Sequence, residues 1–587
     1  MLQVATTALL LLVLPASTRG QEAGWSQDPP ALQDLVAFDR TQSDLRVAVQ
    51  RFEEDRRALG RRWDVPYSPV RRERYRRFYE GWTDALEDVD FGALNHEGQV
   101  DYVLMRTTLE FELEMLRQEA SAMEEMAPLV PFARSLGTLQ EDRRNRDAVD
   151  PRTVATVLHE VANQVESLTA AIRSGQPDLP PIKAVAAGRA ASFTSELRQV
   201  LEGWHRFYDG YDPLFTWWAA EPYERLDAAL EEYAAAIRDH LVGDAGSGPV
   251  IGDPIGEEGL EAHLAHEMIP YSGEELIAIA EAEFAWMEEA LLEASREMGY
   301  GDDWKAAQEA VKEGAVEPGL KPAVVRELAA QSVSFIGERD WITMPPLAEE
   351  IWRMEMMPPE RQLVNPFFLG GETIRISYPT DDMAHDAKLM SMRGNNPHFN
   401  RATVHHELIP GHHLQGFMTD RFNEHRQPFS TPFWGEGWAL YWEIILWENE
   451  FPGSPEDRIG MLFWRMHRAA RIIFSLSFHL ERMTPQEAVD FLVERVGHER
   501  ANAEAEVRRS FEGNYSPLYQ VAYMIGGMQF RALYGELVES GQMTAREFHD
   551  AVLRGGRMPV EMVRARLTDQ PLSRGYTTTW RFAGDQN

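Results

Sequence analysis

Residues 404–415 of the chain read VHHELIPGHHLQ and place four histidines within nine residues, beside a glutamate. Buried imidazoles cost stability unless they have partners, so this density next to a carboxylate indicates a metal site. In the common zinc-binding helix, two histidines four residues apart face one ion, and the glutamate after the first histidine is the general base. Here the position four residues after His406 is Pro410, and the next histidine is His412.

An undistorted helix cannot bring His406 and His412 together. Six residues turn a side chain by ~240° on an ideal helix, at ~100° per residue. Pro410 removes a backbone donor and Gly411 permits unusual dihedral angles. We therefore expect a kink or bulge at this point that absorbs two extra residues and brings His412 round.

The predicted ligands follow from this expected kink. We predict His406 and His412 as metal ligands and Glu407 as the general base. The pairs 405/412 and 406/413 share a helix face, but each pair is about 10 Å apart along the axis, which disfavours joint ligation. His413 or His405 is the alternative to His412.

A third ligand is expected, because catalytic zinc has three protein ligands and one open position. Residues 433–443 read FWGEGWALYWE, a helical pattern in which Glu436 and Glu443 share one face among aromatic side chains. Carboxylates in apolar surroundings are costly unless they are paired or metal-bound. We predict Glu436 as the third ligand of one zinc ion per chain and Glu443 as the acceptor for a ligating histidine, with the reverse assignment as the alternative.

Composition excludes several classes of partner. The chain has 587 residues with 94 acidic and 58 basic side chains, a net charge of −36. A surface this acidic repels a phosphate backbone, so we expect no nucleic acid partner. The chain has no cysteine, so it can form no disulfide, thiolate ligand or lipid-modified cysteine. Any metal must be held by histidine and carboxylate.

The N-terminus predicts export. Residues 1–20 read MLQVATTALLLLVLPASTRG, with an apolar run followed by proline and small residues. This pattern is typical of a cleaved signal peptide and is too short to span a bilayer. No later segment approaches ~20 uninterrupted apolar residues, so we expect no integral membrane segment in the mature chain. We predict an exported protein, periplasmic or extracellular.

The remaining sequence divides into two halves by its pattern. Residues 21–340 predict a helical scaffold half, with amphipathic helices such as 100–118 and 273–298. Residues 341–587 predict a catalytic half with short strands and metal-binding helices. Within it, residues 372–378 (ETIRISY) alternate like a short strand, whose edge could bind an extended peptide through backbone hydrogen bonds.

Four stretches together resemble a known family. Residues 406–415, residues 436–443, His479 followed by TPQEA, and residues 516–527 (SPLYQVAYMIGG) are similar to the bacterial proteins grouped as domain of unknown function 885. That family is regarded as zincin-like and related to the helical gluzincin metallopeptidases. The resemblance implies a mainly α, large multi-helix zincin-like fold with a small β element beside a deep active-site cleft. It also implies zinc ligands at His406, His412 and Glu436, with Glu407 as the base.

Two further residues are predicted to be catalytic. His479 matches a family histidine in an Asp-x-Gly-x-His context, but Ser475 and Ser477 replace the Asp and the Gly, so an orienting carboxylate is missing. Tyr519 and Tyr523 lie on one face of a predicted helix, where a hydroxyl could stabilise an oxyanion. We predict Tyr523 first. The alternative for His479 is a core or surface histidine, and the alternative for the tyrosines is a packed aromatic in a helix interface.

The leading functional prediction is a zinc-dependent hydrolase, a metallopeptidase acting on short peptides outside the cytoplasm. One alternative is a metal hydrolase of non-peptide amides or esters, which the same ligands would serve. Another is a non-catalytic helical binding or scaffold protein whose histidines are structural or only sequester metal. Residues 266–270 (HEMIP) echo the motif, but no Gly-His-His follows, so we interpret them as structural.

Overall fold

The computed structural model describes residues 32–175, 180–243, 250–362, 368–512 and 515–583. Helices form nearly all of its regular structure and one three-stranded sheet forms the rest, which confirms the prediction of a mainly α fold with a small β element. The predicted signal peptide, residues 1–20, lies outside the described residues. Within the described part of the chain, no helix is both long enough and apolar enough for a bilayer crossing.

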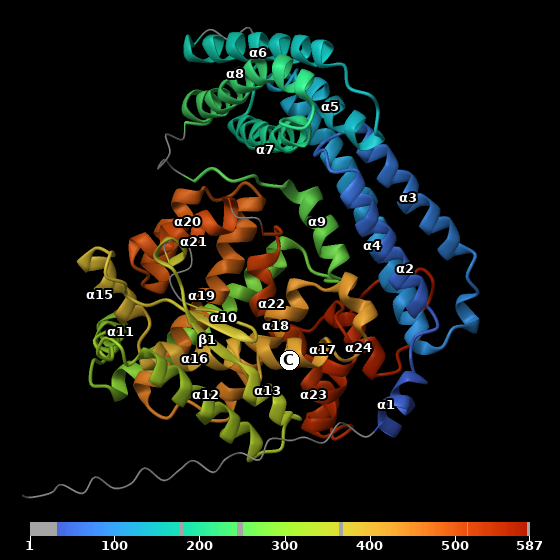
Figure 1. Ribbon diagram of the computed structural model, residues 1–587. Coiled ribbons are helices and arrows are strands. Elements are labelled where there is room, and N and C mark those ends of the chain that lie inside the picture. The colour runs from blue at the N-terminus through green and yellow to red at the C-terminus, as the bar shows by residue number, and fades with distance from the viewer. Residues whose placement is uncertain (1–31, 176–179, 244–249, 363–367, 513–514, 584–587) are drawn as a thin grey trace, which may run out of the picture.

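The N-terminal helices run along one side of the molecule (Figure 1). Asn95 begins the longest of them by accepting a hydrogen bond from the Gly98 amide. This helix contains the predicted helix over 100–118. The group comprises α1 (Leu32–Asp39), α2 (Arg46–Arg62), α3 (Pro69–Glu87), η1 (Phe91–Ala93), α4 (His96–Met126) and η2 (Ala127–Leu129).

The next four helices form a lobe with its own hydrophobic core. Leu158, Phe193, Leu230 and Tyr233 are among its buried side chains. Figure 1 shows this α5–α8 lobe above the remainder of the molecule. It consists of α5 (Ala133–Asn145), α6 (Pro151–Arg173), α7 (Ala184–Tyr208), α8 (Pro213–Ile237) and the π-helix η3 (Arg238–Val242).

The remaining helices form the body. The predicted helix over 273–298 is α10. The elements are α9 (Gly256–His266), α10 (Gly273–Glu297), α11 (Trp304–Lys312), α12 (Lys321–Gly337), α13 (Pro346–Ile351), α14 (Pro359–Gln362), α15 (His385–Gly394), α16 (Pro397–Glu407), α17 (His412–Thr419), η4 (Glu424–Phe429), α18 (Pro432–Glu448), α19 (Pro455–His479), α20 (Pro485–Phe491), η5 (Leu492–Val496), α21 (Arg500–Glu512), α22 (Tyr519–Tyr534), η6 (Gly535–Glu539), α23 (Ala545–Arg554) and α24 (Val560–Leu567).

The hydrophobic cores of the body join residues from both predicted halves. Phe284 of α10 shares one core with Met466 of α19, and Met105 of α4 shares another with Trp438 of α18. The division at residue 340 stays a prediction.

The sheet has the order β1-β3-β2, with β1 (Arg353–Met356), β2 (Phe368–Leu369) and β3 (Thr373–Ile376). The predicted strand over 372–378 is β3, and its buried Ile374 and Ile376 face the small core beneath the sheet. β3 pairs in parallel with β1 and antiparallel with β2. The expectation that this strand offers a free edge is therefore wrong, because both of its edges are hydrogen-bonded. In the described residues the free edges belong to β1 and β2.

Glycines allow α18 and α22 to cross at backbone contact. A Cβ atom on Gly437 would lie 2.6 Å from the backbone of Gly526, and one on Gly526 would lie 2.3 Å from the Phe433 carbonyl oxygen. Only glycine permits so close an approach. The crossing places Glu436 of α18 beside the first turn of α22.

Candidate metal centre

His406 lies at the buried C-terminal end of helix α16. Asn396 caps the start of the helix by accepting hydrogen bonds from the amides of His398 and Phe399, and Pro397 is the first helical residue. The helix ends at Glu407, so His406 lies in the last turn, where its side chain is 2% exposed.

The expected kink is a complete break between α16 and α17. Gly411 is required there, because a Cβ atom on it would lie 1.8 Å from the His406 carbonyl oxygen. Two side chains hold the connecting loop: Ser332 Oγ donates to the Ile409 carbonyl at 2.8 Å, and Trp438 Nε1 donates to the Pro410 carbonyl at 2.9 Å. The chain therefore turns tightly enough for His412, the first residue of α17, to face His406.

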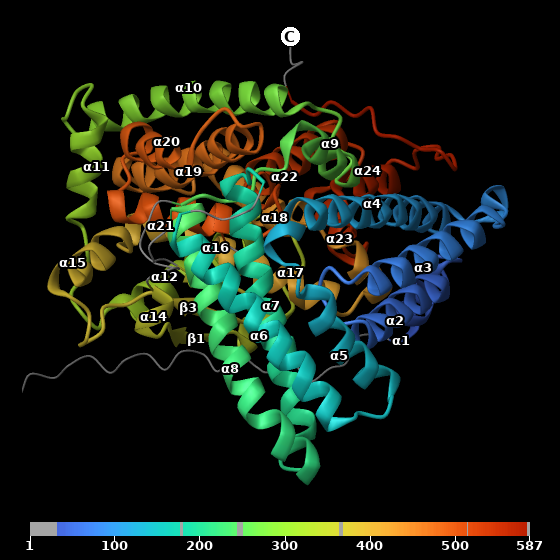
Figure 2. The same ribbon diagram turned by 90° about the horizontal axis from the view of Figure 1, so that it is seen from above.

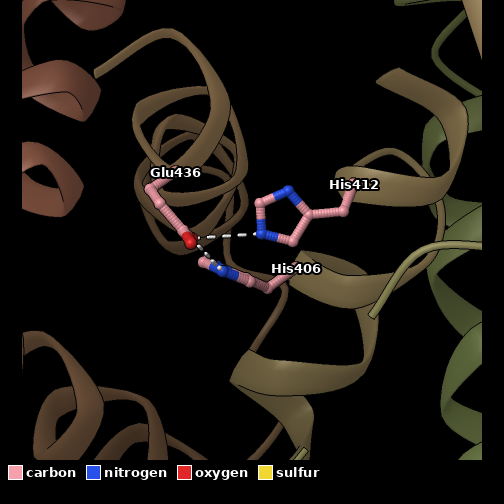
Figure 3. Close-up of side chains that lie close together, drawn as sticks. All are labelled: His406, His412 and Glu436. Carbon is pink, nitrogen blue, oxygen red and sulfur yellow. Dashed lines mark hydrogen bonds and ion pairs between the residues drawn. The ribbon is translucent and has the colours of Figure 1, made fainter. Parts of the chain in front are cut away.

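His406, His412 and Glu436 point toward one another from α16, α17 and α18 (Figure 3). Glu436 Oε2 lies 3.1 Å from His412 Nε2 and 3.5 Å from His406 Nε2. The three potential ligand atoms all lie within 4.8 Å of one another. The two imidazole rings are nearly perpendicular, with 87° between their planes. Among the described residues, these three form the one group of histidines and carboxylates with such spacing.

The spacing of these atoms fits a zinc ion. Zinc binds imidazole nitrogen and carboxylate oxygen at about 2.0–2.2 Å, and a tetrahedral arrangement at that radius separates ligand atoms by about 3.3–3.6 Å. The distance from Glu436 to His406, 3.5 Å, lies within this range, and the distance to His412, 3.1 Å, lies just below it. Two neutral nitrogens and one carboxylate, without any thiolate, are also the donor set of catalytic rather than purely structural zinc sites.

Glu443 holds the far side of His406. Its Oε1 accepts a hydrogen bond from His406 Nδ1 at 2.7 Å, and both side chains are buried. Burial lowers the pKa of His406, but hydrogen bonds to Glu436 and Glu443 outweigh it and raise that pKa to about 9. Burial likewise raises the pKa of Glu436, yet His412 and His406 hold it well below its usual range. Each buried charge thus has an opposite partner.

The alternative histidines face elsewhere. Adjacent helical residues point about 100° apart, so His405 cannot follow His406 toward Glu436. Its ring meets the edge of Phe451, at 5.7 Å between centroids. His413 Nε2 lies 2.7 Å from the Ala348 carbonyl oxygen. The structure therefore groups His406 with His412 rather than with either alternative.

Glu407, the predicted base, closes α16 next to the ligand His406. Its side chain is half-buried, and its charge contributes to the raised pKa of His406. The turn between β2 and β3 lies against it: Gly371 N donates to the Glu407 carbonyl at 3.3 Å. A Cβ atom on Gly370 would lie 1.9 Å from Glu407 Oε2, so glycine there makes room for the carboxylate.

The two predicted tyrosines approach the group from α22. Tyr519 donates its hydroxyl hydrogen bond to Glu436 Oε1, and Tyr523 Oη lies 3.4 Å from Tyr519 Oη. The Tyr523 ring lies nearly parallel to the His406 ring, 6.1 Å between centroids. Both tyrosines therefore lie at the site, and Tyr519, our second choice, contacts the predicted ligand directly.

His479 is not brought to this group. It ends α19, about 16 Å along the helix from Arg468, whose Nη2 lies 3.9 Å from Glu443 Oε1. There it is buried against Phe478 and Phe511, and burial lowers its pKa to about 4. The uninterrupted helix, rather than a bend like that after α16, carries it away from the ligands.

Sequence reasoning missed two arginines on α19. The guanidinium carbons of Arg468 and Arg471 each lie 4.6 Å from the centre of the Tyr523 ring. Arg468 also approaches Glu443, with 3.9 Å between Nη2 and Oε1. The sequence did contain a signal for them: both arginines lie in a largely apolar stretch. Charged residues are rarely buried without partners, so such arginines are expected to pair with other groups of a buried site.

Residues 266–270, which echo the motif, form no second centre. His266 ends α9 and stacks on Phe111, 4.1 Å between ring centroids. The following Glu267 is buried, which raises its pKa to about 8. This packing agrees with the structural interpretation of the segment.

A large cavity of the described residues lies away from the metal centre. It has a volume of about 1300 Å³ between α4, α7 and α9, and none of His406, His412 and Glu436 lines it. A deep cleft at the metal centre therefore stays a prediction.

Comparisons with known proteins identify relatives of unknown function. The family model described as bacterial protein of unknown function (DUF885) matches residues 53–567. A candidate lipoprotein of unknown function from Shewanella oneidensis has a similar structure, with a TM-score of 0.63 and 16% identity over 89% of this chain and 98% of that one. A candidate lipoprotein from Colwellia psychrerythraea gives a TM-score of 0.54, with 16% identity over 89% and 97% of the two chains. No curated protein matches this chain. At this identity the two structures show a shared fold.

Proposed function

The chain belongs to the family of bacterial proteins of unknown function (DUF885), and from the geometry of its metal centre we propose that it is a zinc-dependent hydrolase acting on short peptides. The observation that carries the proposal is the convergence of His406, His412 and Glu436 at distances that suit tetrahedral zinc. Three protein ligands leave one coordination position open, as hydrolytic zinc sites require.

His406, His412 and Glu436 would hold the ion. When bound, zinc supplies Lewis acidity that activates water and polarises a substrate carbonyl. Glu443 keeps His406 in the orientation and tautomer that leave Nε2 free for the metal, because it accepts the hydrogen bond from Nδ1.

Glu407 is the proposed general base. It takes a proton from the attacking water on its carboxylate and delivers that proton to the nitrogen of the leaving amine. Its place next to His406 and the open space provided by Gly370 support this assignment. A glutamine at position 407 would keep the shape but could not accept the proton.

Tyr519 and Tyr523 are the proposed donors to the oxyanion of the tetrahedral intermediate. They are the hydroxyl groups that reach the ligand set from α22. We assign the first role to Tyr523, because the single hydroxyl proton of Tyr519 is already donated to Glu436. We leave His479 out because it lies far along α19.

The short strand β2 supports a peptide as the substrate. It is an edge strand of two residues, Phe368–Leu369, and the turn that follows it lies against Glu407. An extended peptide could pair with this edge through backbone hydrogen bonds and present its scissile bond to the base. We therefore assign to β2 the peptide-binding edge that the sequence predicted at β3.

The place of action is proposed to lie outside the cytoplasm. The N-terminal sequence has the pattern of a signal peptide. Two solved structures with a similar fold are described as candidate lipoproteins, a description that agrees with export. The sequence of this chain contains no cysteine.

Metal analysis of the purified protein tests the proposal. We expect about one zinc per chain in the parent and none in a His406→Ala variant. A His385→Ala variant is the matched control, because His385 is exposed at the start of α15 and should leave the zinc content unchanged. Hydrolysis of a short-peptide library by the zinc-loaded parent, lost in Glu407→Gln, would then support the reaction. A parent that binds no zinc, even when zinc is added, would overturn the proposal.

A further inference from the structure

The end of the α5–α8 lobe exposes an unusual group of large apolar side chains. Five of them fall within twelve residues, across the turn from α7 to α8, and we call them the aromatic tip. Their exposed fractions are 59% for Phe207, 86% for Tyr211, 64% for Leu214, 80% for Trp217 and 39% for Trp218. Exposed apolar side chains are ordinary when scattered, but a contiguous group marks a contact site.

The aromatic tip is held by a well-packed base. Directly beneath it, Trp204 and Phe215 are buried, with their ring centroids 5.4 Å apart. Asp212 caps α8 by accepting hydrogen bonds from the amides of Leu214 and Phe215. The exposure is therefore a property of an ordered helical turn. Figure 2 shows this end of the lobe pointing away from the rest of the molecule.

Arginines flank the rings of the aromatic tip. The guanidinium carbon of Arg143 lies 4.9 Å from the Phe207 ring, and that of Arg152 lies 5.1 Å from the Trp218 ring. Both come from neighbouring helices of the lobe, at the end of α5 and the start of α6. Guanidinium groups in this position can bind phosphate while their stems stay on the aromatic surface.

Carboxylates complete the charge pattern. Asp209 accepts a hydrogen bond from Thr216 Oγ1 at 2.9 Å, and Asp150 and Asp212 cap α6 and α8. The edge of the aromatic tip thus carries both signs of charge at ordered positions. This pattern complements a zwitterionic phospholipid headgroup, whose phosphate suits arginine and whose ammonium suits carboxylates and aromatic faces.

The charge of the whole chain narrows the choice of surface. A net charge of −36 repels an anionic bilayer, whose surface potential attracts basic segments instead. Tryptophan and tyrosine are the side chains that concentrate at the interface between lipid and water, where their apolar rings are buried and their polar atoms stay wet. The composition of the aromatic tip is that of such an interfacial anchor.

We propose that the aromatic tip inserts into the headgroup region of a zwitterionic phospholipid membrane and holds this cysteine-free chain at that surface. The anchor is reversible, because a few side chains bury far less apolar surface than a transmembrane helix. It lies in a lobe that contributes no residue to the metal centre. Membrane binding can therefore be tested, and can fail, independently of zinc binding and hydrolysis.

Vesicle flotation of the full-length mature protein tests the proposal. The probes are vesicles of phosphatidylcholine and phosphatidylethanolamine, with and without about one-third phosphatidylglycerol. The variant combines Leu214→Ser and Trp217→Ser, two exposed residues whose replacement should leave the fold intact. The matched control combines Val47→Ser and Leu320→Ser, which are 70% and 49% exposed elsewhere on the surface.

We expect the parent and the control to float with zwitterionic vesicles and the tip variant to bind at least about tenfold more weakly, since each lost side chain removes apolar area from the interface. Added phosphatidylglycerol should weaken binding by the parent. Brominated lipid should quench tryptophan emission in the parent more than in Trp217→Ser. Equal binding by the tip variant, or no binding by the parent, would overturn the proposal. So would a parent dimer that the tip variant loses, because the aromatic tip would then be an interface between two copies.

Discussion

Replacing Glu443 by alanine isolates the support that this residue gives to the metal centre. In the parent, His406 Nδ1 donates to Glu443 Oε1 at 2.7 Å, and both groups are buried. Alanine leaves the Nδ1 hydrogen without its acceptor at a buried position. It leaves Nε2 available to zinc, so the metal site should be weakened rather than destroyed.

The expected size of the effect follows from two considerations. A buried donor left without its acceptor costs about 1–3 kcal/mol. Loss of the carboxylate that supports a ligating histidine lowers metal affinity about 10- to 100-fold, which corresponds to ~1.4–2.8 kcal/mol. The two estimates agree. Glu436→Ala removes a ligand atom itself and should lower affinity by considerably more than 100-fold.

Zinc competition against a chelator of known affinity measures both variants on the same scale. Glu448→Ala is the control on the same helix, because its carboxylate pairs with Arg531 at the surface and should not affect zinc binding. Glu443→Gln keeps an acceptor oxygen and should restore part of the affinity. A larger loss in Glu443→Ala than in Glu436→Ala would make Glu443 the third ligand. An unchanged affinity would refute the support role.

Three further predictions concern individual residues. Glu407→Gln should abolish hydrolysis by the zinc-loaded protein while metal analysis still finds about one zinc; loss of the metal would instead make Glu407 a ligand. Gly411→Ala should place a methyl group 1.8 Å from the His406 carbonyl oxygen unless the loop shifts. Zinc affinity should therefore fall by at least about tenfold, while circular dichroism shows that the helices are retained. An affinity equal to that of the parent would show that the loop relaxes freely. Burial raises the pKa of Glu267 from 4.5 to about 8, so the folded chain holds a proton that the unfolded chain releases, and stability falls as pH rises through this range. Urea denaturation of the parent and of Glu267→Gln at pH 5.5 and 8.5 should show the parent losing roughly 3 kcal/mol more than the variant, at about 1.36 kcal/mol per pH unit; parallel pH profiles would contradict the raised pKa.

The sequence predicted much of the site because its chemistry is local. The density of histidines around His406 and the carboxylates seven residues apart on one helix are visible without any tertiary contact. The helical pattern of residues 100–118 and 273–298 likewise predicted α4 and α10, since amphipathic spacing is a property of each segment alone. The resemblance to the family added the same residues and the mainly helical fold.

Other features depended on neighbours that are distant in the sequence. The position of His479 could not be read from its motif, because the straight course of α19 moves it away from the ligands. The strand over 372–378 was predicted, but its partners β1 and β2 leave it no free edge. Arg468 and Arg471 entered the site only because α19 packs against α16 and α22.

The sequence by itself determined which residue types could bind a metal: with no cysteine, only histidine and carboxylate remain, and they are concentrated around residues 405–413 and 436–443. Only the tertiary structure decided which of them converge. A broken helix turns His412 rather than His413 toward His406, because Gly411 fits against a backbone oxygen where no side chain could. Two glycines at the crossing of α18 and α22 then set Glu436 between those histidines and Tyr519. Ligand identity is local chemistry, whereas ligand geometry is set by backbone packing between segments far apart in the chain.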